Sequence, residues 1–275
     1  MIKLSMSVVC YNPPLDQLQS LIDSLVVSIK HLQRHCPSPL ISIFLVDNSE
    51  GTSSLTELCS RERQRLKKYE VELKSIAGHG NIGYGRAHNL TLSLIDSDFH
   101  LILNPDVTVK EDTLFLAVDQ MSKNRDIKAL SPSATDSSGN KQYLCKAYPS
   151  VLTLLIRGFG PSVVKRVFSD RLSVYEMRHL SEDKPTEAMM MLGGCFLLVD
   201  TETLKAINGF DERFFLYFED FDFSIRISKY GKLVYYPGVR ITHSGGNTSS
   251  KGPWHICIFL TSAIRFFNIH GWRFL

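Results

Sequence analysis

Residues 41–49 read Ile41-Ser42-Ile43-Phe44-Leu45-Val46-Asp47-Asn48-Ser49, a mostly apolar run that stops abruptly at polar side chains. A run this short is typical of a buried β-strand. Further strand patterns occur at residues 5–10, 71–76 and 100–103, and stretches with helical spacing of apolar residues separate them. Alternating strands and helices predict an α/β fold, in which a mostly parallel sheet carries helices on both faces.

Polar residues stand where several of these strands are expected to end. Tyr11 and Asn12 follow the first strand, Asp47 ends the second, and Asp106 follows the strand at 100–103. In open α/β sheets, ligands bind at the carboxyl ends of the strands. The sequence therefore predicts a ligand site at this edge of the sheet.

The triplet Asn104-Pro105-Asp106 is suited to a divalent cation. Pro105 fixes the backbone so that Asp106 projects from the strand end. A Mg²⁺ or Mn²⁺ ion that bridges a diphosphate needs only one or two protein carboxylates, because phosphate oxygens and water complete its shell. A β-turn in which Asp106 is only a turn former is the alternative.

Two further features lie near the same edge. Asp47 is expected to accept the N3–H of a uracil or thymine ring, or else to cap a helix over residues 52–58. The Gly-rich loop at 78–85 lacks the spacing of the dinucleotide-binding fingerprint. Its glycines are predicted to let the chain approach a ligand closely, with Asn81 and Asn89 as neutral hydrogen-bonding groups.

An aromatic and acidic segment, residues 209–226, contains Phe218-Glu219-Asp220-Phe221-Asp222-Phe223. Burial among aromatic rings raises the pKa of a carboxyl group, which is how a general base is usually made. On a helix, Glu219, Asp222 and Arg226 share one face, and Asp220 lies about 100° around the axis from Glu219. We expect one carboxylate to pair with Arg226 and another to face the site. Solvated acids on an amphipathic helix are the alternative.

The second half of the chain is predicted to differ from the first. Residues 131–140 read as a polar loop, and residues 189–199 read as a buried strand that Gly193-Gly194 interrupts. His243 ends a later strand pattern before Ser-Gly-Gly. We expect it to bind a metal or a phosphate, with a purely structural histidine as the alternative.

Composition limits the class of protein. At 275 residues with 44% hydrophobic content, the chain can bury the core of one large domain. No apolar run reaches the roughly 18–20 residues of a membrane span, and the N-terminus reads as a strand and not as a signal peptide. Six scattered cysteines without a C-x-x-C pair predict reduced thiols in a cytoplasmic protein without a zinc site.

Charge is unevenly distributed, because no Asp or Glu follows Asp222. A one-signed tail predicts phosphates, pyrophosphates or an anionic membrane surface as partners, and no nucleic acid. Residues 149–172 and the tail at 251–275 are both apolar and basic. They are interpreted as an interfacial membrane element or, equally well, as core helices with solvated basic faces. The chain stops soon after an apolar stretch, as a piece of a longer protein would.

These motifs, in order over residues 5–250, resemble those of the family 2 inverting glycosyltransferases of the GT-A fold. Within that family the chain is most similar to the bacterial rhamnosyltransferase branch that builds O-antigen and related polysaccharides. The wider family has an Asp-x-Asp triplet at the metal position, where this chain has Asn104, and the difference fits the rhamnosyltransferase branch. The resemblance rests on Asp47-Asn48-Ser49, Asn81-x-Gly83-x-Gly85, Asn89, Asn104-Pro105-Asp106, Gly193-Gly194, the 209–226 segment and His243.

The resemblance implies a single GT-A domain of Rossmann-like type, with Asp220 as the catalytic base and a divalent metal, Mg²⁺ or Mn²⁺, as the cofactor. Residues 1–130 would form the nucleotide-sugar-binding half, residues 131–250 the acceptor and catalytic half, and residues 251–275 the basic apolar tail. Residues and resemblance together assign metal binding to Asp106 and His243, donor binding to Tyr11, Asn12, Asp47, Asn81, Gly83, Asn89 and Asn104, and acceptor or support roles to Gly194, Glu219, Asp222 and Arg226.

The implied activity is transfer of a sugar, L-rhamnose from dTDP-rhamnose, to a saccharide on a lipid diphosphate at the inner face of the cytoplasmic membrane. A UDP- or GDP-sugar donor is the alternative within the family. A non-catalytic nucleotide-sugar or glycan-binding module is the alternative from another class. A nucleotidyltransferase is disfavoured, because Tyr11-Asn12-Pro13-Pro14 stands where its Gly-rich basic loop would follow the first strand.

Overall fold

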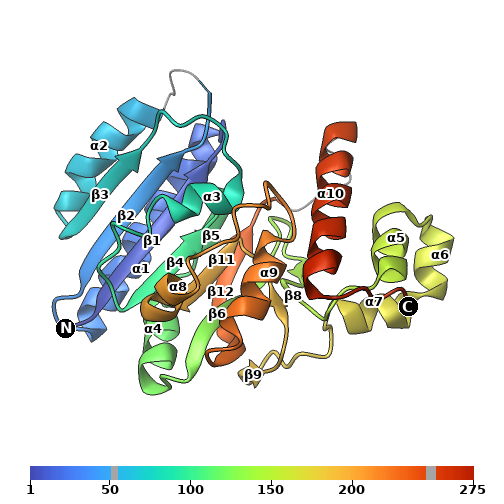
Figure 1. The fold of residues 1–275 in the computed structure, drawn as a ribbon. Helices are drawn as coiled ribbons and strands as arrows, with labels where there is room; N and C mark the ends of the chain where they lie inside the picture. The colour runs from blue at the N-terminus through green and yellow to red at the C-terminus, as the bar shows by residue number, and fades with distance from the viewer. Residues whose placement is uncertain (51–54, 246–251) are drawn as a thin grey trace.

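The computed structural model describes residues 1–50, 55–245 and 252–275 (Figure 1). Its first part alternates strands and helices, as the sequence predicts. The elements are β1 (Lys3–Cys10), α1 (Leu15–His35), β2 (Leu40–Asp47), α2 (Leu55–Lys67), β3 (Val71–Ile76), α3 (Tyr84–Asn89), β4 (Phe99–Leu103), β5 (Val107–Val109) and α4 (Thr113–Lys123).

The elements of the second part range from two-residue strands to an 18-residue helix at the end. They are β6 (Ile127–Thr135), β7 (Lys141–Gln142), β8 (Cys145–Lys146), α5 (Val151–Phe159), α6 (Ser162–Val167), α7 (Ser169–Tyr175), β9 (Thr186–Glu187), β10 (Met191–Leu192), β11 (Phe196–Asp200), α8 (Thr201–Ala206), α9 (Glu219–Ile227), β12 (Lys232–His243) and α10 (Pro253–His270). In Figure 1, α10 and the helices α5–α7 lie together beyond the sheet. None of the helices described combines the length and apolarity needed to cross a bilayer.

One ten-stranded sheet joins both parts of the chain, in the order β3-β2-β1-β4-β11-β6-β12-β5, with β7 on β6 and β9 on β12. Strands β3, β2, β1 and β4 run parallel, and β6 is parallel to β12. β11 is antiparallel to both β4 and β6. The predicted α/β class with a mostly parallel sheet is confirmed. The predicted division at residue 130 falls inside β6, so the two halves share one sheet.

Each face of the sheet is covered by helices. Along β4, Leu101 and Leu103 join one buried cluster and Ile102 joins another, as the two-residue repeat of a strand requires. The first cluster includes Leu21 of α1 and similar residues of α2 and α4. The second includes Phe223 of α9 and a leucine of α8. The arrangement leaves the carboxyl ends of β1 and β4 at an edge beside the start of α9 (Figure 1).

Two expectations about local structure were wrong. Residues 131–135 belong to β6 and not to a polar loop, because β12 pairs with them and Ser131 is fully buried. The apolar residues Ala87, Leu90, Leu92 and Leu94 predict a longer helix after the Gly-rich loop. The helix ends instead at Asn89, because the chain then folds into tight turns, with Thr91 N–H donating to His88 O at 3.0 Å.

A buried polar chain links β1 to β4 and α3. The Ser7 hydroxyl lies 2.7 Å from His88 Nδ1 and 2.8 Å from His100 Nε2, and Ser5 Oγ lies 2.7 Å from His100 Nδ1. Burial lowers the pKa of His100 to about 3, and it also lowers the pKa of His88, which the neighbouring His100 lowers further. Both imidazoles are therefore neutral in the folded protein at neutral pH.

Acid is expected to destabilise the protein through these histidines. The unfolded chain binds protons at His100 below about pH 6.5 and the folded chain does not, so the free energy of unfolding falls by up to about 1.4 kcal/mol per pH unit for each histidine. Urea unfolding at pH 6.5, 5.5 and 4.5 measures it. The raised pKa values of Glu219 and Asp220 have the opposite effect on the free energy of unfolding, because the folded protein binds these protons first. The wild type is therefore compared with His100→Gln, in which the free energy of unfolding should change less with pH. Parallel pH curves would contradict the prediction.

Candidate active site

A cavity of about 580 Å³ lies where β1 and β4 end. It brings together many of the residues predicted from the sequence. A second cavity, of about 900 Å³, adjoins it and shares both Glu219 and Asp220 with it. Predicted site residues that line the first cavity are Tyr11, Asn12, Asn104, Asp106, Gly194, Glu219, Asp220 and His243.

Asp220 stands in the first turn of α9, at the junction of the two cavities. The Gly194 N–H donates to Asp220 Oδ2 at 3.2 Å, and the Phe221 N–H donates to Oδ1 at 2.9 Å. Burial outweighs these hydrogen bonds and raises the pKa of Asp220 to about 6. A carboxylate with this pKa, fixed by backbone donors and open to two cavities, is suited to accept a proton near neutral pH.

Glu219 also faces the cavities, although the sequence placed it on the face of Asp222 and Arg226. Its Oε2 is buried and has no hydrogen-bond partner among the described residues. Burial and then the charge of Asp220 raise the pKa of Glu219 well above its usual range. Asp220 accepts from two backbone N–H groups, whereas Glu219 Oε2 has no partner among the described residues, so Glu219 is the carboxyl group of the two that favours the protonated form.

The approach to α9 explains why these two carboxylates point into the cavities. Tyr217 and Phe218 both have left-handed backbones, with φ of 68° and 63°. This turn is anchored by the Tyr84 N–H, which donates to Phe215 O at 2.9 Å. A Cβ at Gly83, whose φ is 93°, would lie 2.5 Å from the same oxygen. Glycine is therefore required at this position by the chain's own packing.

The expected ion pair between one carboxylate of the 209–226 segment and Arg226 is present, and the carboxylate is that of Asp222. Arg226 Nε donates to Asp222 Oδ2 at 2.7 Å, and Arg226 Nη1 donates to Ile207 O at 2.9 Å. His270 of α10 lies 2.8 Å from the other oxygen of Asp222. Asp222 is 1% exposed, so this buried carboxylate is paired on both sides. No pattern in the sequence links His270 to α9 across 48 residues.

Asp106 and His243 form a second pair of polar side chains that lines the first cavity. Asp106 Oδ1 is buried without a hydrogen bond to any described residue, and His243 Nε2 lies 3.6 Å from it. The Gln142 amide group donates to His243 O and Gly245 O, which places its oxygen 2.8 Å from His243 Nδ1. Because that oxygen only accepts, Nδ1 carries a proton, and in the neutral form of the imidazole Nε2 has its lone pair available beside Asp106. A Cβ at Gly245 would overlap Asp106 Oδ2.

Four predicted donor residues do not line either cavity. Asp47 lies at the same sheet edge and its Oδ1 accepts from the Ser49 N–H at 3.1 Å, while its alternative role as a helix cap concerns residues 52–54, which lie outside the described part. Asn81 Oδ1 accepts from Asn48 Nδ2 at 3.0 Å, and this hydrogen bond fixes the Gly-rich loop to the end of β2. Gly83 fits against Phe215, as described above, so the close approach expected for a ligand is made by the chain itself.

Asn89 is used to fix the start of the 209–226 segment. Its amide donates to Phe210 O at 2.8 Å and accepts from the Phe210 N–H at 2.9 Å. A Cβ at Gly209 would overlap the Asn89 oxygen. These contacts give Asn89 a positioning role in place of the predicted donor contact.

Tyr84 is a site residue that the sequence reasoning missed. Its hydroxyl donates to Gly194 O at 2.7 Å, while the N–H of Gly194 holds Asp220. Burial raises the pKa of Tyr84 well above its usual value, so the phenol stays protonated and keeps donating. In the sequence, the feature that could have indicated this role is the position of Tyr84 between Gly83 and Gly85 of the Gly-rich loop.

The first cavity is thus lined by a carboxylate paired with an imidazole, Asp106 and His243, and by the half-buried carboxylate of Asp220, whose pKa is raised. A family model described as glycosyl transferase family 2 matches residues 5–191. The chain belongs to this family.

Relatives with known names agree with this assignment. The chain is 28% identical over 229 residues to the N-acetylglucosaminyl-diphospho-decaprenol L-rhamnosyltransferase of Mycobacterium tuberculosis, covering 78% of this chain and 69% of that protein. It is 24% identical over 237 residues to rhamnosyltransferase WbbL of Escherichia coli, covering 83% of this chain and 78% of WbbL.

Solved structures show the same fold. The crystal structure of GalNAc-T7 with UDP, GalNAc and Mn²⁺ superposes with a TM-score of 0.66 at 16% identity, covering 98% of this chain. This chain spans 48% of that one, about half of its length. The structural neighbours are GT-A glycosyltransferases, so the predicted GT-A fold is confirmed.

Proposed function

We propose that this glycosyltransferase moves L-rhamnose from dTDP-rhamnose, with inversion, to a saccharide carried by a lipid diphosphate in the synthesis of a bacterial surface polysaccharide. The names of the two rhamnosyltransferase relatives support the sugar, and the mycobacterial name supports the lipid-linked acceptor. The acceptor would place the protein in the cytoplasm, peripherally on the inner face of the cytoplasmic membrane. The division into donor, acceptor and tail segments at 1–130, 131–250 and 251–275 belongs to this proposal.

The observation that carries the proposal is the place of Asp220 where two cavities meet. A donor in the first cavity and an acceptor in the second would bring an acceptor hydroxyl beside Asp220. Its carboxylate takes the hydroxyl proton as the oxygen attacks the anomeric carbon, and the bond to the nucleoside diphosphate breaks. Gly194 and Tyr84 hold the base in place. Glu219, which keeps its own proton, supports Asp220 without competing for the proton of the hydroxyl.

Asp106 and His243 fit a divalent metal. A carboxylate oxygen that has no hydrogen-bond partner among the described residues and an oriented imidazole nitrogen are suitable ligands for Mn²⁺ or Mg²⁺. No group of three His, Cys, Asp or Glu side chains gathers in residues 1–50, 55–245 and 252–275, so diphosphate oxygens would have to complete the shell. When bound, the metal would neutralise charge on the leaving diphosphate.

Loss of the Asp106 carboxylate is expected to weaken metal binding. In Asp106→Asn, the affinity for Mn²⁺ in the presence of dTDP should fall by at least the roughly 10–100-fold that loss of a second-shell partner costs. Electron paramagnetic resonance of Mn²⁺ measures the free ion directly. Binding of thymidine, which lacks phosphates, serves as the control and should not change. Equal Mn²⁺ affinity in both proteins would remove Asp106 from the metal site.

An assay of sugar transfer tests the proposed function. Wild-type protein is incubated with dTDP-rhamnose, UDP-sugars or GDP-sugars, with and without a lipid-diphosphate saccharide, in Mn²⁺ or in EDTA. We expect transfer from dTDP-rhamnose that requires the acceptor and that EDTA suppresses. Transfer from a UDP- or GDP-sugar instead would support the alternative donor. Tight donor binding without turnover of any sugar would support the non-catalytic module.

A further inference from the structure

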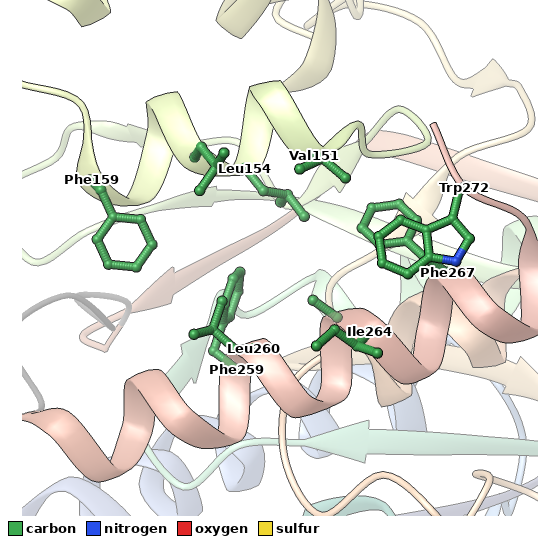
Figure 2. Close-up of a pocket in the computed structure, with 10 residues that line it drawn as sticks. Val151, Leu154, Phe159, Phe259, Leu260, Ile264, Phe267 and Trp272 are labelled. Carbon is green, nitrogen blue, oxygen red and sulfur yellow. The ribbon is translucent and has the colours of Figure 1, made fainter. Parts of the chain in front are cut away.

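An apolar groove runs between α5 and α10, at a distance along the chain from every residue assigned above to the donor. Figure 2 shows side chains of the two helices facing one another across it. Several are widely exposed, including Phe159 at 54%, Ile264 at 51% and Leu260 at 44%. Exposed apolar surface gathered in one place is typical of a binding surface. Its lining includes Val151, Leu154, Phe159, Leu260, Ile264 and Trp272.

The two helices that form the walls of the groove are held together at one end. The N–H groups of Val151 and Leu152, in the first turn of α5, donate to Arg273 O and Phe274 O at 2.8 and 3.1 Å. Trp272 stacks on Phe267 of α10 with a centroid distance of 5.1 Å. The segment after α10 therefore ties the two helices together at one end, and Figure 2 shows Trp272 at that end.

The groove is continuous with the second cavity. Leu154 and Phe259 line both of them. The second cavity in turn reaches Asp220. An elongated ligand can therefore extend from Asp220 through the second cavity into the groove.

Among the charged residues that line the second cavity, Lys146, Arg157 and Arg178 form a cluster around the single carboxylate of Glu176, while the fourth lining cation, Lys141, pairs with Glu182. Arg178 Nη2 lies 2.6 Å and Arg157 Nε 3.4 Å from the oxygens of Glu176. Lys146 is 9% exposed, and burial followed by the charge of Arg157 lowers its pKa to about 8. One carboxylate cannot neutralise three cations, and positive charge in excess at a partly buried site favours an anion.

We propose that the acceptor occupies all three features at once, with its sugar at Asp220, its diphosphate at Lys146, Arg157 and Arg178, and the first units of its hydrocarbon chain in the α5–α10 groove. This inference rests on the proposed function, because it takes the acceptor to be a lipid diphosphate. It assigns the order of chemistry along the path, which is polar sugar, dianionic linker and apolar chain. The residues that line the two cavities include groups suited to each of these parts.

Farnesyl diphosphate tests the lipid subsite without any sugar or donor. In Trp254→Phe protein, Trp272 is the only tryptophan, so its fluorescence reports occupation of the groove. Titrations in EDTA keep the probe from the metal site. We expect farnesyl diphosphate to bind at least about tenfold more tightly than inorganic diphosphate, and Ile264→Asn to weaken it about tenfold. Arg178→Gln should weaken farnesyl diphosphate binding but leave farnesol binding unchanged.

Val174→Asn is the matched control, because Val174 is 64% exposed on α7 and does not line the groove. Its affinity for the probe should stay within about twofold of the parent protein. Equal losses in Ile264→Asn and Val174→Asn would overturn the proposal. So would unchanged probe binding in Ile264→Asn together with lost flotation on phosphatidylglycerol vesicles, which would make the groove a bilayer contact. Probe binding without any sugar transfer would support the subsite and contradict the proposed function alone.

Discussion

Asp220→Asn is expected to slow sugar transfer by about 10²–10⁴-fold and to leave nucleotide-sugar binding unchanged. The substitution keeps the size of the side chain and can keep its hydrogen bond from the Gly194 N–H, which measures 3.2 Å in the wild type. It removes only the ability to accept a proton from the acceptor hydroxyl. Single-turnover transfer with saturating acceptor measures the rate, and calorimetric titration with dTDP-rhamnose measures donor affinity.

Glu219→Gln provides the matched control for this prediction. Glu219 is the preceding residue, is more deeply buried than Asp220, and lines the same two cavities. Because its raised pKa keeps it protonated, replacing it should cost much less of the rate. A larger loss in Glu219→Gln than in Asp220→Asn would reverse the two roles. Near-native transfer by Asp220→Asn would show that another group is the base.

Arg226→Met is expected to lower the free energy of unfolding by about 3 kcal/mol, because it leaves Asp222 as a buried carboxylate that has lost one partner. Asp222 is 1% exposed, and the Arg226 side chain is 22% exposed. His270 still contacts the other carboxylate oxygen at 2.8 Å. Urea unfolding at pH 7 measures the change. The contacts that remain in the variant, including that of His270, should hold the first turn of α9 in place.

Two further variants separate the ion pair from the loss of a side chain. Lys123 and Asp119 form a pair with the same i, i+4 spacing on the surface, where the Lys123 side chain is 73% exposed. Lys123→Met should change stability by less than about 0.5 kcal/mol. Adding Asp222→Leu to Arg226→Met should restore most of the lost stability, since no unpaired charge remains. Equal effects of Arg226→Met and Lys123→Met would contradict this account.

The sheet and the position of its site could be predicted from the sequence, because both follow from short-range patterns. The run at 41–46 is apolar and stops at Asp47, so it defines a strand and the edge at which it ends. Parallel pairing of β1 with β4 then places Tyr11 and Asn104 at one edge, whatever their separation in the chain. Helical spacing likewise predicted the pair of Asp222 and Arg226.

Other features depend on partners that no local pattern reveals. In a sequence, a glycine that leaves space for a ligand cannot be distinguished from one that leaves space for a neighbouring stretch of backbone. At Gly83 the space is taken by the backbone of Phe215. Ser131 looks like a loop residue until β12 pairs with its strand. Glu219 turns into the cavities because the backbone at Tyr217 and Phe218 is left-handed, a conformation that aromatic residues seldom adopt.

The pH dependence of single-turnover transfer tests the central claim most directly. If Asp220 is the base, with a pKa that burial raises to about 6, the wild-type rate should rise about tenfold per pH unit below that value and level off above it. Asp220→Asn should be slower at every pH and should show no such inflection. A variant that retains the wild-type inflection near pH 6 would contradict the account, because a different group would then accept the proton.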